Sequence, residues 1–328
     1  MRRLLAILVL IALAVGLWAL YGIFLPIKPA QTQDVLLHPG WSTRRIAREL
    51  KSAGVIRSAN AFALLHYIQP GRSLKAGEYK FDSSANALAV RDRLARGDIF
   101  AHTVVVPEGY NMFDIAQAVQ DSGLGSADDF LKIARSETSL IHSFDPQAKT
   151  LEGYLFPDTY EFTRTQSMHD IVAMMVKRFQ QEAKVIGLQG NIHTIVTMAS
   201  IVEKESAVPE ERPEVASVYY NRLSKRMGLA ADPTVVYAAL LGGNYRGTIY
   251  QSDLHADSPY NTYKFAGLPP GPIANPGASA LKAAMNPAHT DYLYFVAEGN
   301  GSGRHRFSST YEQHEKNVIA YRRTQNNH

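Results

Sequence analysis

The stretch Thr194-Ile-Val-Thr-Met-Ala-Ser-Ile-Val-Glu-Lys-Glu-Ser206 runs from a mostly apolar segment straight into two carboxylates. Apolar side chains recur at the three-and-four spacing of a helix, which predicts that one side of it is buried: Ile192, Ile195, Met198, Ala199 and Val202. On a helical wheel at ~100° per residue, Lys204 points away from the apolar arc, while Glu203 and Glu205 lie near its two edges. The sequence therefore predicts a buried helix that ends in two partly buried acids.

A carboxyl group that is partly withdrawn from water has a raised pKa, because burial disfavours its charged form. Such a group can hold a proton near neutral pH and then donate it, as a general acid must. The alternative is that Glu203, Lys204 and Glu205 form an ordinary solvated helix end. The wheel does not choose between the two acids.

The N-terminus predicts a membrane segment. Arg2 and Arg3 precede an uncharged apolar run from Leu4 to Ile27, which as a helix at ~1.5 Å per residue is long enough to cross a ~30 Å hydrocarbon core. The two arginines indicate a cytoplasmic N-terminus, with the rest of the chain outside. A cleaved signal peptide is the alternative, since Ala12-Leu13-Ala14 resembles a cleavage site, but the apolar run continues well past it.

Composition narrows the chemistry of the remaining chain. Of the 328 residues, 46% are apolar and 20% charged, a globular composition whose length suits about two domains. The chain has no Cys, which excludes disulfides and thiolate catalysis, and its 11 His are scattered, so we expect no metal and no cofactor. The net charge of +4 comes without a dense Lys/Arg cluster, so nucleic acid is not an expected partner.

A pattern in the first half of the chain occurs twice. Residues 35–62 and 104–130 each read as a strand, a turn with Gly and an aromatic residue, a helix closing at Gly, and a second helix. This unit resembles LysM, a small α+β module that binds the amino-sugar backbone of cell-wall glycans. Trp41 and Tyr110, the aromatic residues of the two turns, suit sugar stacking and core packing equally.

The second half combines helices with loops dense in Pro, Gly, Tyr and Asn, above all around 151–160, 259–263 and 267–277. Rigid loops with aromatic rings and amides beside a buried acid suit a carbohydrate cleft, and the alternative is that they simply wall off a core. We expect helices over 168–182, 215–223, 232–241 and 311–323, and a hairpin of strands over 292–297 and 304–307.

Six motifs occur in order: Leu151-Glu-Gly-Tyr-Leu-Phe-Pro-Asp-Thr-Tyr160, Ala199-Ser-Ile-Val-Glu-Lys-Glu-Ser206, Asn221-Arg222, Asp232-Pro-Thr234, Tyr260-Asn-Thr-Tyr263 and Gly267-Leu-Pro-Pro-Gly-Pro-Ile273. Together they resemble the MltG/YceG-like endolytic murein transglycosylases over nearly the whole chain. The implied fold is α+β: a transmembrane anchor over 1–27, a LysM-like region over 28–149, and a mixed α/β catalytic domain of the YceG-like type over 150–328.

The resemblance implies a lyase that cleaves the β-1,4 bond between N-acetylmuramic acid and N-acetylglucosamine within nascent peptidoglycan strands, leaving 1,6-anhydro ends and terminating glycan elongation. It assigns the catalytic acid to the second glutamate, Glu205. The supporting residues that we expect around the acid or the sugar are Ser206, Asn221, Tyr260, Asn261 and Tyr263. It also implies the cytoplasmic (inner) membrane as location, with the catalytic domain outside it, and peptidoglycan synthases (penicillin-binding proteins) as partners.

Two other functions stay open. A muramidase-type hydrolase of the same bond would pair Glu205 with a second carboxylate, for which Asp232, Glu152 and Asp158 are available in sequence. A membrane-tethered wall-binding scaffold without turnover would need the LysM-like region alone.

Overall fold

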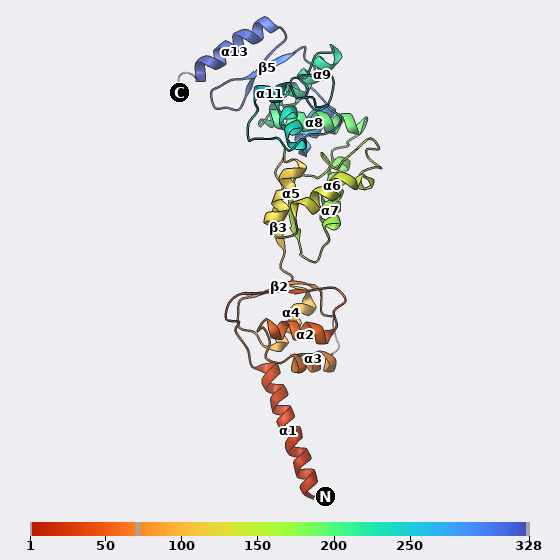
Figure 1. Ribbon diagram of the computed structural model, residues 1–328, viewed down its shortest axis with the longest axis vertical. Helices are drawn as coiled ribbons and strands as arrows, with labels where there is room; N and C mark the ends of the chain where they lie inside the picture. Colours follow the sequence, from red (N-terminus) through yellow and green to blue (C-terminus); the bar gives the residue numbers. More distant parts are fainter. Residues whose placement is uncertain (1, 70–72, 326–328) are drawn as a thin grey trace. The chain divides into compact units, whose positions relative to one another are not determined.

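The computed structural model describes residues 2–69 and 73–325 of the chain, shown in Figure 1. The chain divides into two compact units, which we describe separately: unit 1 is Met1–Thr103 with Glu161–Ser167, and unit 2 is Val104–Tyr160 with Met168–His328. The elements of unit 1 are α1 (Arg2–Phe24), β1 (Gln33–Leu37), α2 (Thr43–Ser52), α3 (Ala59–Ile68), β2 (Gly77–Phe81) and α4 (Ala87–Arg96). Strands β3 (His102–Val105) and β4 (Thr159–Phe162) pair with each other as a two-stranded sheet.

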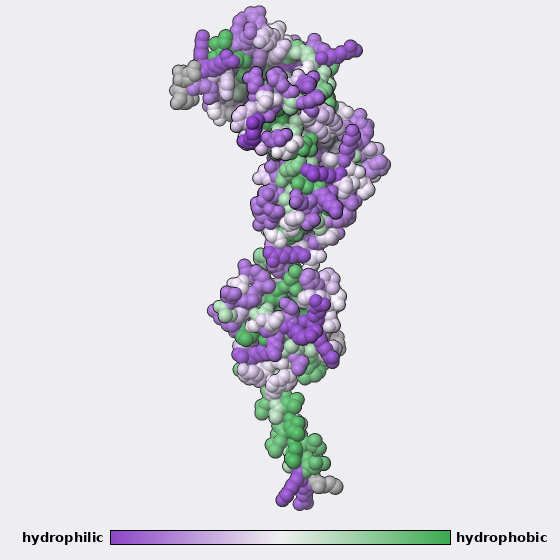
Figure 2. All heavy atoms as spheres, in the orientation of Figure 1, coloured by the Kyte–Doolittle hydropathy of each residue, from purple (hydrophilic) through white to green (hydrophobic). Residues whose placement is uncertain are grey.

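Helix α1 confirms the predicted apolar segment. It is 23 residues long with a mean hydropathy of 2.7, and its side chains stand exposed as a continuous hydrophobic rod (Figure 2). It is the one helix in the described part of the chain that is long and apolar enough to cross a membrane, and a membrane anchor and a signal sequence both fit it.

Strand β1 pairs antiparallel with β2 over the register Gln33↔Phe81 to Leu37↔Gly77. Helices α2, α3 and α4 pack against this pair and close a core of unit 1 built from Leu37, Leu50, Phe62, Tyr79 and Leu94. Each of the three helices begins at a side-chain cap, Ser42, Ser58 and Asn86 respectively. These caps satisfy backbone N–H groups that a helix leaves unpaired at its start, which explains where the helices begin.

The two copies of the predicted internal repeat have the same order of elements in the fold. The second copy contains β3, α5 (Met112–Asp121) and α6 (Ala127–Ser136), matching β1, α2 and α3 of the first. The turn glycines Gly40 and Gly109 both have φ of +80°, and the helix-ending glycines Gly54 and Gly123 have φ of +69° and +71°. A left-handed residue is needed at each of these four places, and glycine adopts that conformation without a steric cost.

The second copy packs in unit 2, with α6 against α7 (Met168–Val185). Backbone bonds fasten it there: Leu151 N–H donates to Ala134 O at 2.7 Å, and Val106 N–H donates to Asp158 O at 2.9 Å. Residues 104–149, which the sequence analysis grouped with the first copy, therefore share a unit with the glutamate helix.

Unit 2 is built around that helix, α8 (Ile192–Glu205), which confirms the prediction for its sequence. Helices α9 (Arg212–Ser224), α10 (Asp232–Leu241) and α12 (Ala278–Met285) pack against α8. The antiparallel hairpin β5 (Tyr294–Ala297) and β6 (His305–Ser308) packs against α13 (Tyr311–Gln325). The short elements are η1 (Thr138–Leu140), η2 (Pro209–Glu211) and α11 (Gln251–Leu254).

The Pro/Gly-rich loop lies on α8. Residues 271–277 are buried, Ile273 N–H donates to Ser200 Oγ at 3.0 Å, and Gly277 N–H donates to Glu203 Oε2 at 3.0 Å. This part of the loop therefore belongs to the core of unit 2, as the alternative interpretation of the Pro/Gly-rich loops held.

Candidate active site

Glu205, the last residue of helix α8, lies beside a cavity. Asn191 caps the start of the helix by accepting the Thr194 N–H at 3.1 Å, and the residues from Ile195 to Val202 are buried. The helix ends at Glu205 because Ser206 takes an extended conformation, with φ of −125° and ψ of 116°. The Ser206 hydroxyl donates to Val208 O at 3.0 Å and accepts the Val208 N–H at 3.2 Å, which turns the chain away. Glu205 is thereby left in the final turn.

The cavity beside Glu205 has a volume of about 250 Å³. Segments far apart in sequence line it, namely the ends of α8 and α9, the start of α10, the loops before α10 and after α11, β5 and α13. The lining residues are Glu205, Tyr219, Arg222, Ala230, Asp232, Tyr263, Phe295 and His314.

Burial raises the pKa of Glu205 to about 7. A hydrogen bond from the Tyr219 hydroxyl lowers this pKa, the negative charge of Asp232 raises it, and the positive charge of Arg222 lowers it. Near neutral pH the carboxyl group therefore populates both its protonated and its ionised form. A group poised in this way can give up a proton and take one back.

The other charged residues of the cavity are held in fixed positions. The Tyr263 hydroxyl donates to Asp232 Oδ1 at 2.5 Å. Arg222 donates through Nε to Leu293 O at 2.7 Å and through Nη1 to Leu229 O at 2.6 Å. Because backbone carbonyls hold the guanidinium, its charge stays beside the carboxyl group of Glu205.

Glu203 occupies a different environment from Glu205. Its side chain is 4% exposed and forms an ion pair with Arg212, in which Nη2 donates to Glu203 Oε1 at 2.6 Å. The Arg212 side chain is itself 5% exposed. Burial raises the pKa of Glu203, while the Gly277 N–H and the charge of Arg212 lower it. Both acids are thus partly or fully buried, as predicted, and the solvated-end interpretation is wrong. Glu203 ties α8 to α9 and to the Pro/Gly-rich loop, whereas Glu205 faces a cavity.

The other residues expected at the site divide into two groups. Tyr263 lines the cavity, whereas Ser206, Asn221, Tyr260 and Asn261 lie outside its lining. Asn221 donates to Thr290 O and Tyr292 O, and Asn261 donates to the carbonyls of 253, 254 and 256. The amide groups of these two side chains therefore hydrogen-bond to the protein backbone and stabilise loops.

The three carboxylates that were available as partners of Glu205 also separate. Asp232 lines the cavity. Asp158 pairs with Arg178 at 2.7 Å. Glu152 is fully buried and accepts the Met112 N–H at 2.9 Å and Asn275 Nδ2–H at 2.8 Å, and burial raises its pKa to about 8.

A second cavity, of about 260 Å³, also has Asp232 in its lining. Its other lining residues come from α8, α10, the start of α5 and the loops around them: Asn111, Lys204, Pro233, Val236, Tyr237, Leu240, Tyr245 and Ile273. Asp232 is therefore common to two hollows of unit 2.

Sequence reasoning did not single out Tyr219, Phe295 or His314 as site residues. Tyr219 stands in the helix that precedes the Asn221-Arg222 motif, and its spacing from Arg222 would have put both on one face. Phe295 and His314 have no local signal, because only the tertiary fold brings β5 and α13 to α8. Within residues 2–69 and 73–325, no group of three His, Asp or Glu side chains is arranged to hold a metal ion.

Comparison with known proteins gives consistent matches. The model of the YceG-like family matches residues 35–320. An endolytic murein transglycosylase from Bacillus subtilis is 36% identical over 307 residues, which are 87% of this chain and 83% of that protein. An endolytic murein transglycosylase from Streptococcus pneumoniae is 32% identical over 86% of this chain and 57% of its own length. The crystal structure of a YceG-like protein from Listeria monocytogenes is similar with a TM-score of 0.57 at 35% identity, covering 87% of this chain and 99% of that one.

Proposed function

This chain belongs to the YceG-like family, and on that premise we propose that it is an endolytic murein transglycosylase, a lyase that cuts within peptidoglycan glycan strands. The observation that carries the proposal is Glu205, a half-buried carboxyl group with a pKa of about 7 that faces a 250 Å³ cavity. The similarity to endolytic murein transglycosylases supports peptidoglycan as the substrate, and the position of Glu205 in the cavity lining supports its role as the catalytic acid.

In the proposed reaction Glu205 acts twice. Protonated Glu205 donates its proton to the glycosidic oxygen that leaves as the muramic acid C1 gains oxocarbenium character. The resulting carboxylate then accepts the proton of the C6 hydroxyl of the same sugar, whose oxygen attacks C1. One bond to C1 breaks and one forms, the leaving sugar keeps the first proton, and the product ends in a 1,6-anhydro ring without consuming water.

The surrounding side chains suit both steps. Tyr219 and Arg222 favour the ionised form of Glu205, while burial and Asp232 favour the protonated form, so neither form is strongly trapped. A carboxylate at Asp232, held by Tyr263, would stabilise positive charge developing at C1. The second cavity, which Asp232 also lines, would give a glycan polymer room beyond the cleavage point.

A muramidase-type hydrolase is the second candidate, because Asp232 lines the same cavity as Glu205. In that reaction Asp232 would serve as the nucleophile or activate a water molecule, and the product would carry a reducing end.

Three further parts of the proposal concern place and partners. We propose that α1 anchors the protein in the cytoplasmic membrane with Arg2 and Arg3 inside and both units outside. The antiparallel β1–β2 pair with two helices between its strands supports a LysM-like role for unit 1 in binding the glycan. Trp41 packs against the core of unit 1, with Arg45 4.1 Å from its ring centroid and the His38 ring 5.0 Å away, which favours core packing over sugar stacking for this residue. Peptidoglycan synthases are the proposed protein partners.

The test is mass spectrometry of the products after the full-length protein, in detergent, is incubated with intact peptidoglycan. Internal fragments with 1,6-anhydro ends are expected. Fragments heavier by one water, with reducing ends, would assign the protein to the hydrolases, and glycan binding without any fragments would assign it to the scaffolds.

A further inference from the structure

Contacts within unit 1 fix the end of α1 against α3. A Cβ atom on Gly22 would lie 2.8 Å from the Ala61 Cβ, so the two helices touch at backbone distance. Arg57, just before α3, donates to Pro26 O at 2.9 Å and to the Tyr21 hydroxyl at 3.0 Å. These contacts place α3 beside the point where the chain leaves its apolar segment, as Figure 1 also shows.

Helix α3 exposes large apolar side chains next to this junction. Leu64, Tyr67 and Ile68 are 41%, 57% and 67% exposed, and the helix contains no Asp, Glu, Lys or Arg. These side chains lie close to the contact between α1 and α3, since Ile68 is seven residues, or ~10 Å of helix, from Ala61.

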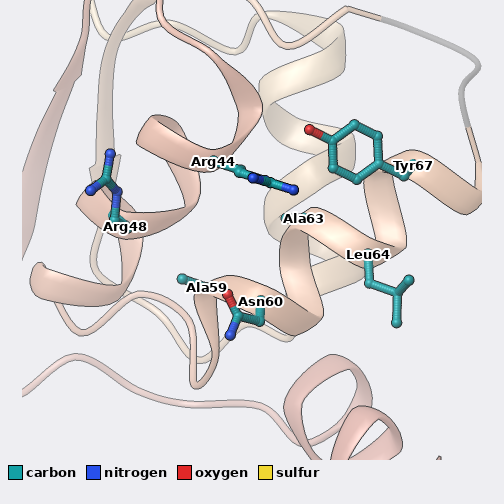
Figure 3. A pocket seen from close by; sticks show the side chains of 7 residues that line it. All are labelled: Arg44, Arg48, Ala59, Asn60, Ala63, Leu64 and Tyr67. Carbon is teal, nitrogen blue, oxygen red and sulfur yellow. The ribbon is translucent and has the colours of Figure 1, made fainter.

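The neighbouring helix α2 supplies unpaired positive charge. Arg44 and Arg48 are one helical turn apart, both are exposed, and neither forms an ion pair or a side-chain hydrogen bond among the described residues. Together with α3 they line a hollow of about 610 Å³ whose other residues are Ala59, Asn60, Ala63, Leu64 and Tyr67 (Figure 3). Helix α2 has four basic side chains against one acidic side chain, Glu49.

We propose that this α2–α3 face, defined by Arg44, Arg48, Leu64, Tyr67 and Ile68, rests on the phospholipid head groups of the membrane that α1 enters. Arg44 and Arg48 bind lipid phosphate, and the three apolar side chains enter the interfacial layer. Basic and apolar side chains on one face are what an interfacial helix needs, and Tyr with Arg is typical of the membrane boundary. The inference rests on the proposed membrane anchor.

A lipid surface fits this face better than a glycan does. A glycan could bond to the guanidinium groups and stack on Tyr67, but it would leave Leu64 and Ile68 in water. A lipid head-group layer accommodates all five side chains, and the α1 junction already holds the face close to that layer.

The absence of Cys from the chain allows single-cysteine labelling without other changes. The full-length protein, with a fluorescent label at one of three positions, is reconstituted in vesicles that contain phosphatidylglycerol. Tyr67→Cys reports on the face, Val15→Cys reports on α1, and Asp34→Cys on β1 is the matched exposed control. Quenching is measured with nitroxide lipids labelled on the head group or on the acyl chain, and with a water-soluble quencher.

We expect head-group nitroxides to quench the label at position 67, acyl-chain nitroxides to quench that at 15, and the water-soluble quencher alone to reach that at 34. Quenching at 15 without quenching at 67 overturns the docked face and leaves the anchor intact. Absence of quenching at 15 overturns the anchor and this inference together. Shielding of position 67 by soluble muropeptides and not by lipid assigns the face to the glycan and also overturns the inference.

The charge contribution has its own test. Each basic side chain at an anionic surface raises the equilibrium constant for membrane docking about fivefold. The double variant Arg44→Ala with Arg48→Ala is therefore expected to lower the docking equilibrium constant, measured at position 67, roughly 30-fold. The pair Arg44→Lys and Arg48→Lys keeps the charge and is expected to dock nearly as well. Equal docking of the alanine pair would overturn the role of the arginines.

Discussion

The substitution Tyr219→Phe tests how the cavity sets the pKa of Glu205. Tyr219 is 2% exposed, and its ring packs edge-on to Phe295 with centroids 5.8 Å apart. Phenylalanine keeps that ring contact and removes the hydroxyl that donates to Glu205. The change therefore deletes one hydrogen bond with little effect on packing.

A hydrogen bond to a charged group contributes roughly 1.5–3 kcal/mol, and one pKa unit corresponds to about 1.4 kcal/mol. The hydrogen bond stabilises the ionised carboxylate, so its loss should raise the pKa of Glu205 by roughly one to two units above its value of about 7. An acid with a higher pKa stays protonated to higher pH. The alkaline limb of kcat/KM should therefore move to higher pH in Tyr219→Phe.

The matched variant Asp232→Asn should shift the same limb in the opposite direction. The negative charge of Asp232 raises the pKa of Glu205, so its removal lowers that pKa and ends activity at a lower pH. Asparagine keeps the size of the side chain and an oxygen that can accept the Tyr263 hydroxyl.

The assay measures the release of anhydro-ended fragments as a function of pH, beside a carbon NMR titration of the Glu205 carboxyl group that does not depend on activity. Opposite displacements in the two variants support the electrostatic account. Equal pKa values in wild type and both variants, or displacements of the same sign, would refute it.

Three further predictions concern the scaffold of unit 2, each measured by chemical unfolding. Glu152→Ala should lower the free energy of unfolding by about 3 kcal/mol or more, because it leaves buried N–H donors without an acceptor. Glu152→Gln keeps an acceptor oxygen and should cost less, and equal costs for the two variants would contradict this. Gly153→Ala should lower the free energy of unfolding by well above the ~1 kcal/mol expected of Gly247→Ala. Both glycines have positive φ, but a Cβ at Gly153 would lie 2.5 Å from Pro272, whereas Gly247 faces open space, so similar losses would show that the loop around Pro272 moves aside. Arg212→Met should cost about 3–5 kcal/mol by leaving Glu203 buried without its ion pair, and adding Glu203→Met should recover part of the loss.

The sequence predicted most of the helices and strands, because their signals are local, but it did not predict β4 or the short helix α12. The four repeat glycines occupy turn and helix-end positions of the sequence pattern, and each adopts the left-handed conformation that the pattern implies. The apolar spacing from Ile192 to Val202 fixes α8 and places both acids at its end.

The cavity was less predictable, because its lining comes from segments as far apart as Glu205 and His314. A helical wheel put Glu203 and Glu205 in equivalent positions, and the difference between them arises from Arg212, which is supplied by the next helix. The amides of Asn221 and Asn261 suited sugar binding by type alone. In the fold they bond to backbone carbonyls: Asn221 to those just before β5, and Asn261 to those at the end of α11, which a helix leaves unpaired.

The most direct test of the proposed catalytic acid compares Glu205→Gln with Glu203→Gln in the full-length protein on intact peptidoglycan. We predict that Glu205→Gln unfolds like the wild type yet yields no fragments, because the amide has no proton to donate. Glu203→Gln, though less stable, should still release anhydro-ended fragments. Near-normal cleavage by Glu205→Gln, with cleavage lost in folded Glu203→Gln, would contradict the assignment and transfer the role to Glu203.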